Sequence, residues 1–210
     1  MSVRGQIAVN LTWCIPGVVG GSEEYLCRQL VGVGRAGVFT TVFAPKGFGK
    51  MHPELLEHHR IVEARHDCTS RPRRMVSEST WLRRRTRGAS VVHHGGGTLP
   101  VLVRKPTLLT IHDLQYLQFP QYFSRERLTY LRAVMPRSAL AADLVATPTE
   151  FVKRTVVDAF GVNPERIVVV PHGVDDSLQH DTTPEGELRE RFSLGNDPVL
   201  VMPAATHPHK

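Results

Sequence analysis

Residues 142–175 read ADLVATPTEFVKRTVVDAFGVNPERIVVVPHGVD, and this stretch decides the class of fold. Residues 143–147 form a short apolar run, which is typical of a strand buried in a parallel sheet. A helix is predicted to follow, because Thr147-Pro148-Thr149-Glu150 has the pattern of a capping box with proline at the first helical position. Gly161 predicts the end of that helix, and the β-branched run at 167–170 predicts a central strand. The stretch is therefore a strand–helix–strand unit.

The rest of the chain alternates in the same way between strand and helix patterns. Strands are predicted at residues 7–11, 38–44, 61–64, 89–93 and 107–111, and helices at residues 22–33, 53–58, 71–87 and 124–140. This alternation predicts a parallel sheet with helices on both faces, which is a Rossmann-like, doubly wound α/β fold. We assign that domain to residues 1–178, a polar linker with one short helix to 179–196, and the start of a second domain, with a strand at 198–202, to 197–210.

Composition places the chain among ordinary globular proteins, with 41% hydrophobic and 22% charged residues. There is no apolar run of about 18 residues that could span a membrane. No secretory signal pattern precedes the first strand, so a cytoplasmic location is expected. Cys14, Cys27 and Cys68 lack a CxxC spacing, which favours reduced thiols over a disulfide or zinc framework.

Positive charge is concentrated in one segment of a chain whose net charge is +6, a balance that suits acidic partners. Residues 71–87 contain a single acid, Glu78, and the arginines Arg71, Arg73, Arg74, Arg83, Arg84, Arg85 and Arg87. Apolar residues lie between them, among them Trp81 and Leu82. The segment is either a basic amphipathic helix on an anionic membrane surface or a solvated, arginine-rich helix face. No nucleic-acid-binding motif accompanies the charge, so nucleic acid is not an expected partner.

Two glycine patterns lie near the first predicted helix. Gly20-Gly21 separates the first strand from this helix, and glycines at a helix N-terminus let backbone amides approach a phosphate. The alternative is a tight turn, with Ser22 as the helix cap and Glu23 beside the positive helix end. Residues 32–37 match GxGxxG, but they follow a helix and precede a strand, the reverse of the order that a dinucleotide site requires. They are predicted to be a helix end and loop.

Histidines stand at the ends of three predicted strands. His93-His94 precedes a run of three glycines, His112-Asp113 follows the strand at 107–111, and His172-Gly173 follows the strand at 167–170. The carboxyl ends of parallel strands share one edge of a sheet, so we expect these residues to converge there. His112 and Asp113 could instead cap the next helix, and Asp113 could also fix the tautomer of the imidazole. His93 and His94 have no carboxylate or cysteine at ligand spacing, so no metal site is predicted.

These motifs resemble, in order and spacing, those of the retaining glycosyltransferases of family 4, which have the GT-B fold. The resemblance rests on residues 20–24 (GGSEE), 110–114 (TIHDL), 119–124 (FPQYFS), 142–175 and 203–210 (PAATHPHK), which together span nearly the whole chain. It implies the N-terminal, acceptor-side domain of an enzyme that transfers a sugar from a nucleotide-diphosphate sugar with retention and without a metal.

The same resemblance implies roles for individual residues. His112 is expected to support the reaction centre. The donor-binding residues would be Gly20, Gly21, His172, Gly173 and Lys210. The acceptor-side residues would be His93, His94, Asp113 and Tyr116, although packing of the next helix explains Tyr116 equally well.

The sequence also departs from the family pattern. The arginine expected a few residues before Lys210 is absent, and Ala204-Ala205 stand near that place. The Glu-x7-Glu region of the second domain is missing as well, so we expect a truncated enzyme.

Three functions stay open on the sequence. The first is a glycosyltransferase of polysaccharide biosynthesis, with a saccharide or lipid-linked acceptor, in the cytoplasm or peripheral on the inner face of the membrane. The second is a noncatalytic truncated remnant or acceptor-binding module. The third is a nucleotide-dependent epimerase on the same fold, which product analysis would separate from a transferase.

Overall fold

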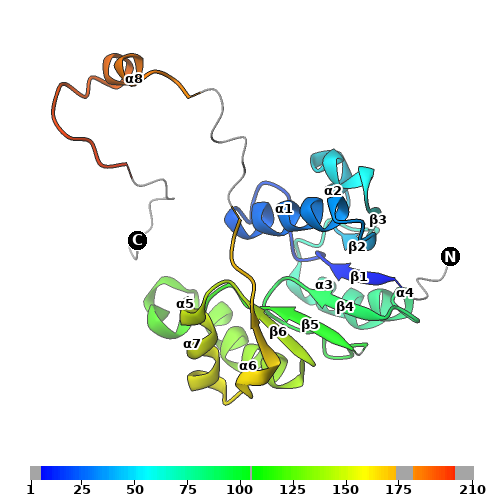
Figure 1. Cartoon of the computed structure of the whole chain (residues 1–210). Helices are drawn as coiled ribbons and strands as arrows, with labels where there is room; N and C mark the ends of the chain where they lie inside the picture. The colour runs from blue at the N-terminus through cyan, green and yellow to red at the C-terminus, as the bar shows by residue number, and fades with distance from the viewer. Residues whose placement is uncertain (1–5, 105, 174–181, 202–210) are drawn as a thin grey trace. The chain divides into compact units, whose positions relative to one another are not determined.

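The computed structural model describes residues 6–104, 106–173 and 182–201 of the chain (Figure 1). The chain divides into two compact units, Met1–Pro171 and His172–Lys210. The first unit contains the sheet and the helices that cover it. The predicted boundaries after residues 178 and 196 remain predictions, because residues 174–181 lie outside the described ranges.

The sheet of the first unit has seven parallel strands in the order β3-β2-β1-β4-β5-β6-β7. The strands are β1 (Ile7–Asn10), β2 (Thr40–Ala44), β3 (Arg60–Glu63), β4 (Val91–His94), β5 (Thr107–Thr110), β6 (Leu144–Thr147) and β7 (Ile167–Val169). The order reverses between β1 and β4, where Asn10 pairs with His94. Ligands of open α/β sheets bind at such a point, outside the carboxyl ends of the strands. The predicted Rossmann-like, doubly wound α/β fold is confirmed.

Helical segments connect the strands by parallel crossovers. They are α1 (Gly21–Arg35), α2 (Phe48–Met51), η1 (Pro53–Glu57), α3 (Arg71–Ser77), the π-helical turn η2 (Glu78–Leu82), α4 (Arg83–Arg85), α5 (Gln115–Gln118), η3 (Pro120–Tyr122), α6 (Arg125–Ala141), α7 (Glu150–Phe160) and η4 (Pro164–Arg166). Figure 1 shows α1 on one side of the sheet, and α6 and α7 on the other. Crossovers of one hand require this, because α1 leads to β2 on one side of β1 whereas the later helices lead away in the opposite direction.

Both faces of the central strands are buried, which explains why their sequences are largely apolar on both faces instead of alternating, apart from polar residues near the strand ends. Val9 packs with residues of α1, whereas its neighbour Ala8 packs with Phe43 and Leu82 on the opposite face. A third cluster surrounds Leu109 and joins β5–β7 to α6 and α7.

The strand–helix–strand unit forms as predicted, with two corrections. The cap of α7 is Thr149, whose hydroxyl accepts the N–H of Val152, and not Thr147, because the helix begins only at Glu150. Gly161 ends the helix in the left-handed conformation, as predicted. The strand predicted as central is, among the described residues, the edge strand β7, which pairs there with β6 alone, and Val168 on it is 38% exposed.

The second unit, within its described residues, contains α8 (Glu185–Phe192), the short helix predicted in the linker. Arg189 holds the turn after it, donating to Glu185 at 2.9 Å and to the carbonyl of Gly195 at 2.7 Å. The strand predicted at 198–202 is not formed by residues 198–201, which are exposed and have no strand beside them in the described part of the chain. An apolar run becomes a strand only when a neighbour accepts its ladder of hydrogen bonds.

Candidate functional site

A buried polar network joins the ends of β1 and β4, where the strand order reverses. The Asn10 side chain lies 3.1 Å from Nδ1 of His94 and 3.2 Å from a carboxylate oxygen of Glu78. The hydroxyl of Thr12 lies 2.7 Å from the same oxygen of Glu78. Glu78 begins the π-helical turn between α3 and α4, and such turns are frequent at functional sites. The only acid of the arginine-rich segment is therefore directed toward the sheet.

The hydrogen bonds of Asn10 fix the tautomer of His94. Oδ1 of Asn10 accepts the backbone N–H of Thr12, so the amide nitrogen faces Nδ1 of His94, which must accept. Neutral His94 therefore carries its proton on Nε2, and burial, followed by the neighbouring His93, lowers its pKa to about 3. Nε2 of His94 is buried and has no hydrogen-bond partner among the described residues.

His93 and His112 meet on the other face of the sheet. His93 is hydrogen-bonded to the hydroxyl of Thr110 at 2.8 Å, and burial, together with the nearby His112, lowers its pKa to about 4. His112 donates from Nε2 to the carbonyl of Gly95 at 3.0 Å, and the ring of Tyr25 from α1 stands edge-on to it at 5.5 Å. The structure thus brings together the carboxyl ends of β4 and β5 and the first turns of α1, which we call the carboxyl edge.

The glycine loop between β1 and α1 lies at this edge, because Gly21 is one helical turn before Tyr25. Gly20 adopts φ 77° and ψ −132°, a conformation that requires glycine, and it takes the capping position predicted for Ser22. The amides of Gly20, Gly21 and Ser22 have no acceptor within the described residues. A β-carbon on either glycine would meet nothing within 4 Å, so the space above them is open.

Asp113 and Tyr116 have local roles that the structure explains. Asp113 accepts the N–H of Gln115 at 3.0 Å and stabilises the turn into α5. Tyr116 is 2% exposed within the core cluster, so its ring offers no surface to a sugar. Its buried hydroxyl has no partner in the described parts of the chain.

The remaining predicted donor residues belong to the second unit of the chain. His172 and Gly173 follow β7 directly but belong to the second unit. Lys210 lies outside the described residues. Contacts of these three residues with a donor remain predictions.

Metal-ligating and thiol groups are dispersed. No group of three or more His, Cys, Asp or Glu side chains gathers in the ranges that the structure describes. His93 and His94 are consecutive in β4 and point to opposite faces, so they cannot hold one ion together. The three cysteines are buried and free, and burial raises the pKa of Cys27 to about 12 and that of Cys68 to about 11.

The arginine-rich segment has apolar side chains on both sides: Leu82 and Trp81 pack against the sheet, whereas Val76 is exposed. Leu82 is buried, and Trp81 packs edge-on against Phe43 at 5.6 Å. The binding of this segment to a membrane surface remains a prediction. Exposed arginines, among them Arg84 and Arg85, cover the outer side.

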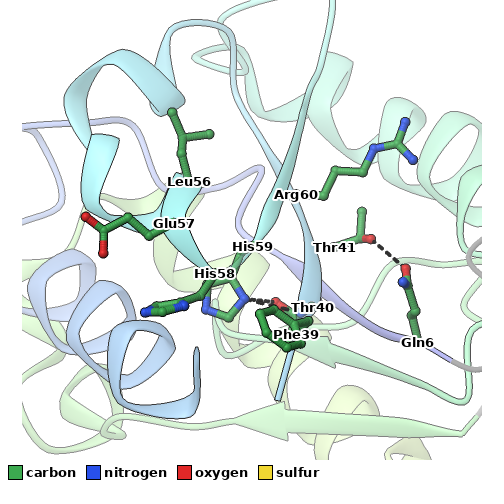
Figure 2. A pocket seen from close by; sticks show the side chains of 9 residues that line it. All are labelled: Gln6, Phe39, Thr40, Thr41, Leu56, Glu57, His58, His59 and Arg60. Carbon is green, nitrogen blue, oxygen red and sulfur yellow. Dashed lines mark hydrogen bonds between the residues drawn. The ribbon is translucent and has the colours of Figure 1, made fainter. Parts of the chain in front are cut away.

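A surface hollow of about 340 Å³ lies at the opposite, amino edge of the sheet, between the starts of β2 and β3. Figure 2 shows Phe39, Leu56 and His58 around it, with His59 bonded to Thr40. His59 is a structural residue, because Nδ1 accepts the Thr40 N–H and Nε2 donates to the carbonyl of Leu30 at 2.7 Å. The hollow is far along the strands from the glycine loop, and no sequence motif leads to it.

Several residues of the carboxyl edge escape prediction from sequence. Asn10 is a polar residue that ends an apolar strand, and Glu78 is the lone acid among arginines, so both carried a usable signal. Trp13 carried none. Its ring covers Gly96, where a β-carbon would come within 2.6 Å of it, and its buried Nε1 has no partner among the described residues.

Comparison with solved structures shows which fold this domain shares. A glycosyltransferase from Rickettsia africae ESF-5 is 16% identical, with a TM-score of 0.51, over 91% of this chain and 50% of that chain. HepE from Anabaena is 18% identical; its complex with UDP and glucose has a TM-score of 0.58 over 92% of this chain and 52% of that chain. The structure of HepE with UDP alone has a TM-score of 0.55 to this chain. At these identities the similarity concerns the fold, which is that of one domain of a GT-B glycosyltransferase.

The sequence places the chain more narrowly. It belongs to Glycosyltransferase Family 4, whose sequence pattern matches residues 19–178. No curated protein matches this chain. The chain spans about half the length of the solved structures that it resembles. Within the described ranges, no helix has both the length and the apolar character needed to cross a membrane.

Proposed function

We propose that this chain carries the acceptor-side domain of a retaining, metal-independent glycosyltransferase that uses a nucleotide-diphosphate sugar. The observation that carries the proposal is the meeting of His112, Gly95 and Tyr25 one helical turn from Gly21, at the carboxyl edge of a Family 4 domain. Retention and independence from metal follow from the family resemblance alone. The acceptor is proposed to be a saccharide or a lipid-linked saccharide.

The chemistry of the edge supports this role. The amides of Gly20, Gly21 and Ser22, which lack an acceptor in the described part of the chain, lie at the N-terminus of a 15-residue helix, where the helix dipole favours a phosphate. His112 is half-buried and oriented by Gly95, so a neutral imidazole can orient sugar hydroxyls as positive charge develops on the sugar. His172, Gly173 and Lys210 are proposed to complete the donor contacts. His93, His94 and Asp113 are proposed for the acceptor side, whereas Tyr116, predicted there as well, is buried in the core and is left out of the proposal.

Substitution of His112 tests the proposal. With UDP-glucose and a saccharide acceptor panel, we expect His112→Ala to lower transfer by about a hundredfold without loss of the fold, because one positioned polar group near the reacting centre contributes this much. His58→Ala at the amino edge is the control. Unchanged transfer in His112→Ala would remove the role of His112, and a sugar isomer as product would favour an epimerase.

The second candidate is a noncatalytic acceptor-binding module, favoured by the finding that the chain spans half the length of its structural relatives. Calorimetric titration separates the two. Heat on addition of nucleotide sugars supports the transferase, whereas heat with an acceptor saccharide only supports the module.

We further propose contact with an anionic membrane through exposed arginines, on the cytoplasmic face. The support is electrostatic, since Glu78 faces the sheet and the described carboxylates form no ion pair with Arg84, Arg85 or Arg87. Replacing these three by glutamine should weaken binding to phosphatidylglycerol vesicles by about a hundredfold, at roughly 1 kcal/mol per residue. Arg154→Gln on α7 is the control, and equal binding by both variants would refute the contact.

A further inference from the structure

Glu23 is a buried carboxylate in the first turn of α1, directly after the glycine loop. The residue is 6% exposed, and its two oxygens lie 3.1 and 3.0 Å from the backbone nitrogen of Gly17. One oxygen also lies 2.9 Å from Nε2 of His52. Its neighbour Glu24 is exposed and pairs with Arg28 on the helix surface. Two adjacent acids of one helix turn therefore have different environments.

Glu23 forms hydrogen bonds with both ends of the glycine loop, at Gly17 and at Gly20. Gly17 and Gly20 both adopt positive φ, 73° and 77°, so the loop depends on two residues that are also free to leave these conformations. The Glu23 carboxylate accepts the backbone N–H of Gly17. The backbone N–H of Glu23 donates to the carbonyl of Gly20 at 2.9 Å. The loop is closed onto the helix that it precedes.

His52 anchors this arrangement to the core. It lies between α2 and η1, and its ring packs in a tilted arrangement, with centroids 4.6 Å apart, against Phe48, which is fully buried. Its other nitrogen lies 3.0 Å from the carboxylate of Glu54. The loop is thus connected through Glu23 and His52 to Phe48, a buried core residue of α2.

We propose that Glu23 is a positioning residue that holds the loop in the shape in which the amides of Gly20, Gly21 and Ser22 face a diphosphate. The inference rests on the proposed function. Two physical effects of Glu23 have opposite signs: its charge at a helix N-terminus disfavours an anion, whereas its hydrogen bonds fix the loop before the anion arrives. Positioning is the larger effect, because an unfastened loop must be ordered on binding.

Because the two effects of Glu23 change anion affinity in opposite directions, binding of inorganic pyrophosphate can tell which is larger. Pyrophosphate is the part shared by all nucleotide-diphosphate sugars. Amide shifts of the ¹⁵N-labelled chain report the affinity, and hydrogen exchange of the Gly17 amide reports the loop. We expect Glu23→Ala to bind about tenfold more weakly and to lose Gly17 protection, since each ordered loop residue costs about 1 kcal/mol or more. Glu24→Ala removes the same charge from the same turn, and should bind about twofold more tightly with Gly17 protected.

Two further variants guard against a general loss of the fold. Glu23→Gln retains an acceptor for Gly17 without the charge, and should restore both protection and affinity. His52→Phe keeps the ring contact with Phe48 but removes the nitrogen that faces Glu23. It should partly weaken both the protection of the Gly17 amide and the affinity for pyrophosphate. Pyrophosphate binding by Glu23→Ala that equals or exceeds that of the original chain would overturn the proposal. If the original chain shows no pyrophosphate shifts, the proposed donor contact fails, while Gly17 exchange still decides whether Glu23 holds the loop.

Discussion

Lowering the pH from 7 to 4 is expected to remove on the order of 5 kcal/mol from the free energy of unfolding, through His93 and His94 alone. Burial lowers the pKa of His93 to about 4 and that of His94 to about 3, from an ordinary value near 6.5. The unfolded chain therefore binds protons at a higher pH than the folded chain does. Stability is complete above about pH 6.5 and falls as the pH drops toward 4 and 3.

The size of the effect is measured by urea unfolding between pH 4 and pH 7. Two variants isolate it: His93→Gln can still reach Thr110, and His94→Asn can still accept from Asn10. Each should flatten the dependence of unfolding free energy on pH, although each also lowers stability at neutral pH. A slope below pH 6.5 that is unchanged in both variants would mean that these imidazoles have the same pKa in the folded and the unfolded chain.

Gly34→Ala is expected to destabilise the chain by about 2 kcal/mol, because an added β-carbon would lie 2.4 Å from the β-carbon of His58. Gly34 is inside α1 and faces the loop after η1, so helix and loop would have to separate. Gly32→Ala, two residues earlier in the same helix, meets nothing within 4 Å and should stabilise the chain by about 0.5–1 kcal/mol through helix propensity.

The pair is compared by chemical denaturation of the two variants. Opposite signs would show that the GxGxxG pattern at residues 32–37 contains a packing glycine and a helix end, not a nucleotide loop. Gains in stability from both variants would mean that α1 and His58 are not in contact.

Fold class could be predicted because it depends on local patterns. The apolar runs, Gly161 and the glycines before α1 each specify a strand, a stop or a turn through their own chemistry, and the parallel order follows from alternation. The residue that caps α7 was harder to predict, because Thr147 and Thr149 both fit the pattern. Only the observed start of the helix at Glu150 selects Thr149. The edge position of β7 was hidden as well, because an apolar strand does not reveal how many neighbours it has.

The site was predictable only in part, for a different reason. His93, His94 and His112 stand out as polar residues at strand ends, so their place at one edge followed from the topology. Glu23 and His52 are 29 positions apart and become partners only through packing of η1 against α1. Likewise, the inward direction of Glu78 depends on a π-helical turn that no composition signals.

An amide-resolved titration of the ¹⁵N-labelled chain with UDP-glucose tests most directly whether a nucleotide sugar meets this domain at the carboxyl edge. The largest shifts are expected at Gly20, Gly21 and Ser22, with smaller ones at Gly95 and His112. Shifts confined to the hollow around Phe39 and His58, or to the arginines of residues 71–87, with the glycine loop unchanged, would contradict it.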